Sequence, residues 1–195
     1  MINNNNAISI FSKTITEQKN KQQDASIWDD SVFEDIDTLK NDYSGKAGEL
    51  FAKQLCEQHG LAHVYAEDTV NQDDGTYDIT IKGKLVEIKT ARVSNTGKNW
   101  QHESLRDYGS DHFMFIDISP TSVYLSIFPS KFDFSKKHPV FGRTPHQRKG
   151  SDGIYKFDFG SKQHTAGIKQ GFTLKIDNNT TDKEFNELIT SQAED

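Results

Sequence analysis

The sequence predicts an α/β fold in which a central mixed sheet of four to five strands is flanked by helices. Three patterns support this prediction: a helical pattern at 44–59, a hairpin pattern at 76–89 and a second hairpin pattern at 113–128. The apolar side of the helix must be buried against one face of the sheet. We expect the C-terminal third to add peripheral elements.

From its length and composition, the chain of 195 residues is expected to form one domain with two appendages. Residues 1–25 are rich in Asn, Gln, Ser, Thr and Lys and are expected to form a low-complexity extension. Residues 26–176 are expected to form the folded domain. Residues 177–195 are expected to form an acidic tail that can adopt a helix.

Two helices are expected before the sheet. Apolar residues recur at helical spacing from Trp28 to Leu39, which predicts a short amphipathic helix. Ser44 is the expected N-cap of the next helix, which runs to about His59 and ends at Gly60. The expected inner side of that helix consists of Ala47, Leu50, Phe51, Gln54, Leu55 and Gln58.

β-branched and aromatic runs between turn residues predict the strands. The first hairpin turns at Lys82-Gly83-Lys84, and the second turns at Ser119-Pro120-Thr121. The remaining expected strands are Ala62 to Glu67, Trp100 to Leu105, Ile154 to Phe159 and Phe172 to Ile176.

Composition also limits the class of protein. The formal net charge of −6 disfavours indiscriminate nucleic-acid binding, because the overall field repels phosphates. Basic residues nevertheless gather at 82–98 and 131–149. The single cysteine, Cys56, excludes an internal disulfide and a multi-cysteine zinc site. No apolar run reaches the ~18 residues of a membrane span, and no signal-peptide pattern is present, so we expect a soluble, cytoplasmic protein.

The first hairpin contains the charged residues that are candidates for a functional site. Glu87 and Lys89 are two residues apart in one strand and therefore share a face, and the hairpin can bring Asp78 beside them. Two carboxylates and an ammonium on one sheet face are costly unless a divalent cation completes the cluster. Carboxylate oxygens suit Mg²⁺ or Mn²⁺. The alternative is a surface hairpin whose charges pair across its strands.

Asp78, the following Glu87-Ile88-Lys89 and the upstream Gly48-Glu49-Leu50-Phe51-Ala52 together resemble the PD-(D/E)XK nuclease superfamily. Tyr77 stands where the family pattern has Pro. The resemblance covers about residues 44–128 and implies a restriction-endonuclease-like core with Glu49, Asp78, Glu87 and Lys89 as catalytic residues. It also implies that Asp78, Glu87 and the backbone carbonyl of Ile88 hold Mg²⁺, for which Mn²⁺ can substitute, and that Glu49 can hold a second ion.

Polar and basic residues outside the motif are candidate contacts to phosphates or base edges. Solvated side chains are the alternative interpretation for each of them. The candidates are Arg92, Lys98, Gln101, Arg143, Arg148 and Lys149.

The resemblance implies a metal-dependent endonuclease acting on double-stranded DNA, most like a type II restriction enzyme. Cleavage of both strands by single-site subunits implies a homodimer, whereas a cognate methyltransferase is not deducible from the sequence. Two alternatives remain open. One is a junction resolvase, a phage or mobile-element nuclease or an RNA-cleaving toxin of the same fold; the other is a non-catalytic nucleic-acid-binding or protein-binding module.

Overall fold

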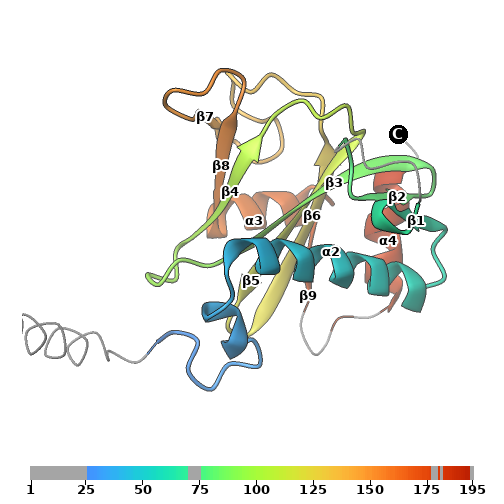
Figure 1. The fold of residues 1–195 in the computed structure, drawn as a ribbon, viewed down its shortest axis with the longest axis horizontal. Coiled ribbons are helices and arrows are strands. Elements are labelled where there is room, and N and C mark those ends of the chain that lie inside the picture. Colours follow the sequence, from blue (N-terminus) through green and yellow to red (C-terminus); the bar gives the residue numbers. More distant parts are fainter. Residues whose placement is uncertain (1–25, 70–75, 177–179, 181, 194–195) are drawn as a thin grey trace, which may run out of the picture.

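Six strands form the main sheet of the computed structural model, in the order β1-β2-β3-β5-β6-β9 (Figure 1). Among the residues that the structure describes, only β3 and β5 are parallel neighbours, so the predicted mixed sheet is confirmed, with six strands there rather than four or five. The structure describes residues 26–69, 76–176, 180 and 182–193, so the expected extension at 1–25 lies outside it. The strands are β1 (His63–Tyr65), β2 (Ile79–Ile81), β3 (Lys84–Arg92), β5 (His112–Ser119), β6 (Ser122–Pro129) and β9 (Thr173–Ile176).

Three further strands form a second sheet in the order β4-β8-β7. They are β4 (Asn99–Leu105), β8 (Tyr155–Gly160) and β7 (His146–Gln147). The helices are α2 (Asn41–Gln58), α3 (Ser161–Lys169) and α4 (Asp182–Ala193), and two 3₁₀ turns are η1 (Glu34–Asp37) and η2 (Ala66–Asp68). Among the described residues, no helix has the length and apolar character needed to cross a membrane.

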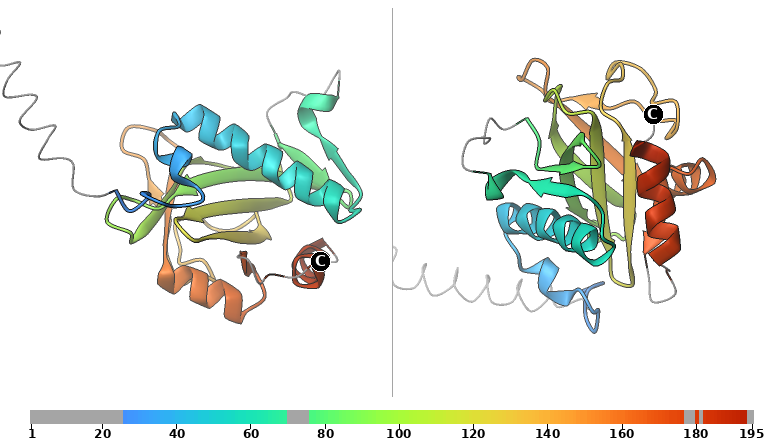
Figure 2. Two further views of the ribbon diagram at one scale, coloured as in Figure 1. Left: turned by 90° about the horizontal axis from the view of Figure 1, so that it is seen from below. Right: turned by 90° about the vertical axis from the view of Figure 1, so that its right-hand side faces the viewer.

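The main sheet has two different faces, because successive side chains in a strand alternate. One face is aliphatic and is covered by α2 and α4, which lie in front of it in the right-hand view of Figure 2. The other face carries the buried rings of Phe113, Phe115 and Phe128. The second sheet covers this face with Phe157 and Phe159, which are also fully buried.

Helix α2 contacts the sheet through small residues. Its buried positions are Gly48, Ala52 and Cys56, whereas Leu50 is 41% exposed. The expected inner side is therefore confirmed only in part: Phe51 and Leu55 are half-buried and pack against the aliphatic core, whereas Ala47, Leu50, Gln54 and Gln58 are exposed. The fully buried positions carry small side chains, which let the helix axis approach the strands more closely than leucines would. Burial raises the pKa of the Cys56 thiol to about 11, as expected for a structural cysteine.

The start of α2 also differs from the prediction. The helix begins at Asn41 with Lys40 at the N-cap, and no side chain caps it. Ser44 lies inside the helix, where its hydroxyl donates to the Lys40 carbonyl at 3.3 Å. The segment from Trp28 to Leu39 forms turns and η1 rather than an amphipathic helix, although Trp28 and Ile36 are buried.

The C-terminal segment belongs to the core. Within the expected tail, α4 buries Phe185, Leu188 and Ile189 against the aliphatic face. The boundary placed at residue 176 is therefore wrong, because it divides one hydrophobic core. Helix α3 and strand β7 were not expected from the sequence.

The tight contact of α2 with β3 generates the first prediction. A Cβ added at Gly48 would lie 1.8 Å from Thr90 Oγ1, whereas a Cβ at Gly45 meets nothing within 4 Å. Gly48→Ala should lower the free energy of unfolding by about 1–3 kcal/mol through overpacking. Gly45→Ala should raise it by up to about 1 kcal/mol through helix propensity.

Urea denaturation of the two variants measures both effects. Thr90→Ala in the Gly48→Ala background removes the nearest atom and should recover part of the loss. Equal stabilities of the two single variants would contradict the close packing of α2 on β3.

Candidate active site

Strand β3 has an open edge because its partner β2 is short. β2 pairs only with Lys84 to Val86, whereas β3 continues to Arg92 with β5 on its other side. In the described part of the chain, no strand is paired with the β2 side of β3 from Glu87 onward. The backbone groups of this edge are therefore available to side chains or to a ligand.

The turn of the hairpin fixes which residues reach this edge. Ile81 pairs with Lys84 across a two-residue loop in which Lys82 and Gly83 have φ of 49° and 82°. Positive φ at both positions is typical of a type I′ turn, which sets the register of the strands. Asp78 consequently lies beside Glu87, because its N–H donates to the Val86 carbonyl at 3.0 Å and its Oδ2 accepts from the Ile88 N–H at 2.7 Å.

Glu87 and Lys89 form a short ion pair in this cluster. Lys89 Nζ lies 2.5 Å from Glu87 Oε1, and Glu87 is only 5% exposed. Burial raises the pKa of the Glu87 carboxyl. Burial alone would lower the pKa of Lys89, yet the adjacent Glu87 carboxylate raises it above its ordinary value, so the ammonium stays charged.

The Asp78 carboxyl lies in an environment that disfavours its negative charge. Burial, followed by repulsion from Glu87, raises the pKa of Asp78 from 3.8 to about 7, although the hydrogen bond from Ile88 acts in the opposite direction. Ionisation of both carboxyls in this half-buried site is therefore unfavourable. A bound cation would relieve that repulsion.

Glu49 reaches the same site from α2. Its Oε2 accepts a 2.7 Å hydrogen bond from the Tyr65 hydroxyl and lies 3.4 Å from Lys46 Nζ. The negative charge of Glu49 contributes to the raised pKa of both Asp78 and Glu87. The structure thus brings Asp78, Glu87 and Lys89 together at the edge of β3, and Glu49 acts on the two carboxyls electrostatically from α2.

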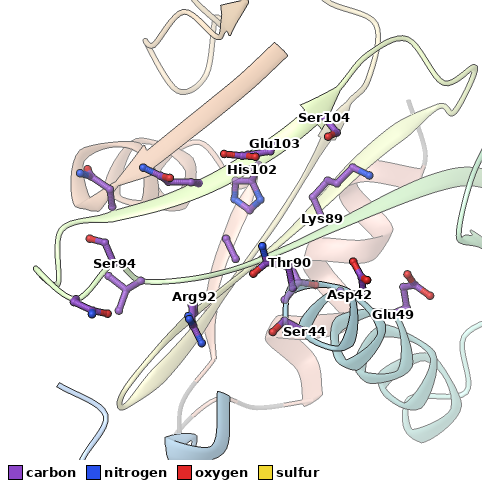
Figure 3. Close-up of a pocket in the computed structure, with 17 residues that line it drawn as sticks. Asp42, Ser44, Glu49, Lys89, Thr90, Arg92, Ser94, His102, Glu103 and Ser104 are labelled. Atoms are coloured by element: carbon purple, nitrogen blue, oxygen red, sulfur yellow. The ribbon is translucent and has the colours of Figure 1, made fainter. Parts of the chain in front are cut away.

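A pocket of about 760 Å³ opens next to this cluster, between the start of α2, the edge of β3 and β4. Its charged lining consists of three carboxylates against two cations, so an added cation would favour the binding of an anionic ligand there. Figure 3 shows side chains that reach the pocket from three elements: Asp42, Ser44 and Glu49 from α2, Lys89, Thr90 and Arg92 from β3, and His102, Glu103 and Ser104 from β4.

The predicted nucleic-acid contacts do not all lie together. Arg92 and Gln101 line the pocket, but Arg92 Nη1 donates to the carbonyls of Ile36 and Asp37 at 2.5 and 2.6 Å. Lys98 is exposed in the loop before β4 and does not line the pocket. Arg143, Arg148 and Lys149 lie in or next to the second sheet, where Arg143 pairs with Asp158 at 3.6 Å.

The donor set fits a hard divalent cation shared with a substrate. Asp78 and Glu87 offer carboxylate oxygens, and the Ile88 carbonyl faces the same edge as its N–H. Among the residues described, no three or more His, Cys, Asp or Glu side chains are grouped as metal ligands. Mg²⁺ needs fewer, since it is bound through one or two carboxylates together with waters and phosphate oxygens.

Two features of the site region escaped the sequence analysis. The ring of Tyr108 lies 4.8 Å from Lys89 Nζ, and no spacing rule connects a loop tyrosine with β3. Behind the pocket, the fully buried Asp117 lies between His102 Nε2 at 2.8 Å and His164 Nε2 at 2.7 Å. Burial alone would raise the pKa of the Asp117 carboxyl, but the two imidazoles hold it below its ordinary value.

Comparisons of this chain with family models, curated proteins and solved structures give no match.

The raised pKa of Asp78 generates a prediction for stability. Between pH about 4 and about 7, Asp78 keeps a proton in the folded state that the unfolded chain has released. The contribution of this proton to the free energy of unfolding is full below pH about 4 and is lost as pH rises through about 7. Asp78→Asn keeps an acceptor for the Ile88 N–H without the charge. In metal-free buffer at pH about 8, the variant should melt at least about 2–4 °C higher than the wild type.

The difference between the two melting temperatures should shrink toward pH about 4. Mg²⁺ should raise the melting temperature of the wild type more at pH about 8 than at pH about 5, and should not do so for the variant. A difference that does not change with pH would contradict the burial of a strained Asp78 carboxylate.

Proposed function

We propose that the protein is a metal-dependent endonuclease that hydrolyses phosphodiester bonds in duplex DNA, with a restriction-endonuclease-like core, and that it is most like a type II restriction enzyme. The proposal rests on one observation. The Asp78 carboxylate accepts a hydrogen bond from the Ile88 N–H, and the preceding residue of the same strand, Glu87, pairs with the Lys89 ammonium. This cluster lies at the open edge of β3, beside a pocket large enough for part of a nucleic acid backbone.

Asp78, Glu87 and the Ile88 carbonyl are the groups that would hold Mg²⁺ or Mn²⁺. When bound, the ion would polarise the scissile phosphate and lower the pKa of a coordinated water. The acidic lining of the pocket supports this requirement, because phosphates would otherwise be repelled.

Lys89 would act as a cation rather than as a base. Its pKa is raised by Glu87, so it remains protonated at neutral pH and can donate to a phosphate oxygen or orient the attacking water. Glu49 accepts hydrogen bonds and would position a water on the opposite wall, held in place by Tyr65 and Lys46. A homodimer would supply one such site for each DNA strand.

Removal of the charged group of Lys89 or of Asp78 should abolish DNA cleavage. Lys89→Ala and Asp78→Ala should each lower the rate of Mg²⁺-dependent DNA cleavage by at least about 100-fold, because the developing charge on phosphate loses its stabilisation. Lys183→Ala is the matched control, since its side chain is 83% exposed on α4. The far-UV circular dichroism of all three variants should match that of the wild type. Cleavage that persists in both motif variants would exclude the assigned site.

The substrate class is tested with supercoiled plasmid, a four-way junction and transfer RNA incubated in parallel with Mg²⁺. We expect defined double-strand breaks in the plasmid, whose ends map to one recurrent sequence. Exclusive cleavage of the junction or of the RNA would keep the chemistry but replace the substrate. Absence of cleavage together with absence of Mg²⁺ binding by calorimetry would refute the proposal.

A further inference from the structure

Strand β4 presents a row of polar side chains to the pocket. Asn99, Gln101 and Glu103 are exposed, whereas the alternating Trp100 and His102 are buried in the aromatic core. All three exposed residues line the pocket that also contains Lys89. Amides and a carboxylate in such a row offer both hydrogen-bond donors and acceptors.

The end of this row is shaped by a backbone irregularity. The pairing of β4 with β8 shifts between His102 and Leu105, and Ser104 has a φ of 60°. The extra residue leaves both Glu103 and Ser104 exposed toward the pocket instead of burying one of them. Because a non-glycine residue in this conformation costs free energy, the surrounding structure must hold it there.

Tyr108 holds the irregularity and connects it with the cluster on β3. Its hydroxyl donates to the Ser104 carbonyl, and its ring lies 4.8 Å from Lys89 Nζ. The polar row therefore has a fixed position relative to the motif lysine. A molecule that contacts Lys89 through a phosphate would present its neighbouring groups to β4.

The chemistry of the row matches the edges of base pairs. Asn and Gln can bind adenine through two hydrogen bonds, and Glu accepts from the amino group of cytosine. Alternate residues of a strand are about 6.6–6.8 Å apart. This spacing is about twice the 3.4 Å step between bases, so successive side chains of the row can reach bases two steps apart.

The charges around the second sheet favour the same ligand. Lys156, on β8, lies 3.9 Å from Glu103 and 3.6 Å from Asp158. Arg148 and Lys149 follow β7 and are exposed. Lys156 beside the row, with Arg148 and Lys149 on the far side of β8, is suited to phosphates that flank a groove, since phosphate contacts position a protein while base contacts specify the sequence.

We propose that β4 is the base-recognition strand of this protein, with Asn99, Gln101 and Glu103 contacting base edges in the major groove of duplex DNA. The inference rests on the proposed nuclease function, because DNA at the β3 cluster is what brings base pairs to β4. The major groove admits β-strands as well as helices, and β4 is an edge strand of its three-stranded sheet.

The test is a binding selection from a randomised DNA duplex library with the full chain. Ca²⁺ replaces Mg²⁺ to fill the acidic site, and the bound duplexes are sequenced. The wild type should enrich one motif. Gln101→Ala should reduce discrimination at one base pair by about 10-fold, the equivalent of about 1.4 kcal/mol, and leave the other positions unchanged. Lys149→Ala is the control and should weaken binding to all sequences alike.

Two outcomes would overturn the inference: a selection that enriches no motif, or a motif that survives unchanged in Asn99→Ala, Gln101→Ala and Glu103→Ala. Cleavage of the enriched duplex in Mg²⁺ is measured separately. A motif that changes with Gln101 but is never cleaved would support recognition by β4 and refute the nuclease. Plasmid cleavage by a protein whose enriched DNA motif is unchanged in the β4 variants would support the nuclease and refute recognition by β4.

Discussion

Next to the end of β2, the Asp78 carboxylate takes the place of a backbone partner on the open edge of β3. It accepts a hydrogen bond from the Ile88 N–H at 2.7 Å. This bond holds an acid against a strand that also carries Glu87, and the two carboxylates raise each other's free energy in a half-buried site. Lys89 offsets part of that cost through its 2.5 Å contact with Glu87. The rest of the fold positions this cluster.

Helix and sheet contribute to that positioning through different features of the sequence. The small residues Gly48, Ala52 and Cys56 bring α2 close to β3, which places Glu49 within reach of the cluster. The aromatic face of the same sheet holds β4 and its polar row in place. A pocket therefore forms at the point where a helix start and two open strand edges meet.

The sequence predicts much of this arrangement because its strongest signals are local. The turn at Lys82-Gly83 and the two-residue periodicity of Glu87 and Lys89 are sufficient to predict the hairpin and its charged residues. The contact face of α2 was predicted only in part, because hydrophobic spacing identifies large residues such as Phe51 and Leu55, whereas the fully buried positions carry small ones. Contacts between distant segments, such as Tyr108 with Lys89, Asp117 with two histidines and α4 with the core, leave no periodic signal.

We propose that Asp78, Glu87 and the Ile88 carbonyl form a cation site at the edge of β3. Anomalous diffraction from crystals soaked in Mn²⁺ tests it most directly, because the ion is located without reference to activity. We expect an anomalous peak within about 2.0–2.3 Å of oxygens from both carboxylates. Full occupancy of Mn²⁺ elsewhere, with the Glu87–Lys89 pair unchanged and no peak beside Asp78, would contradict it.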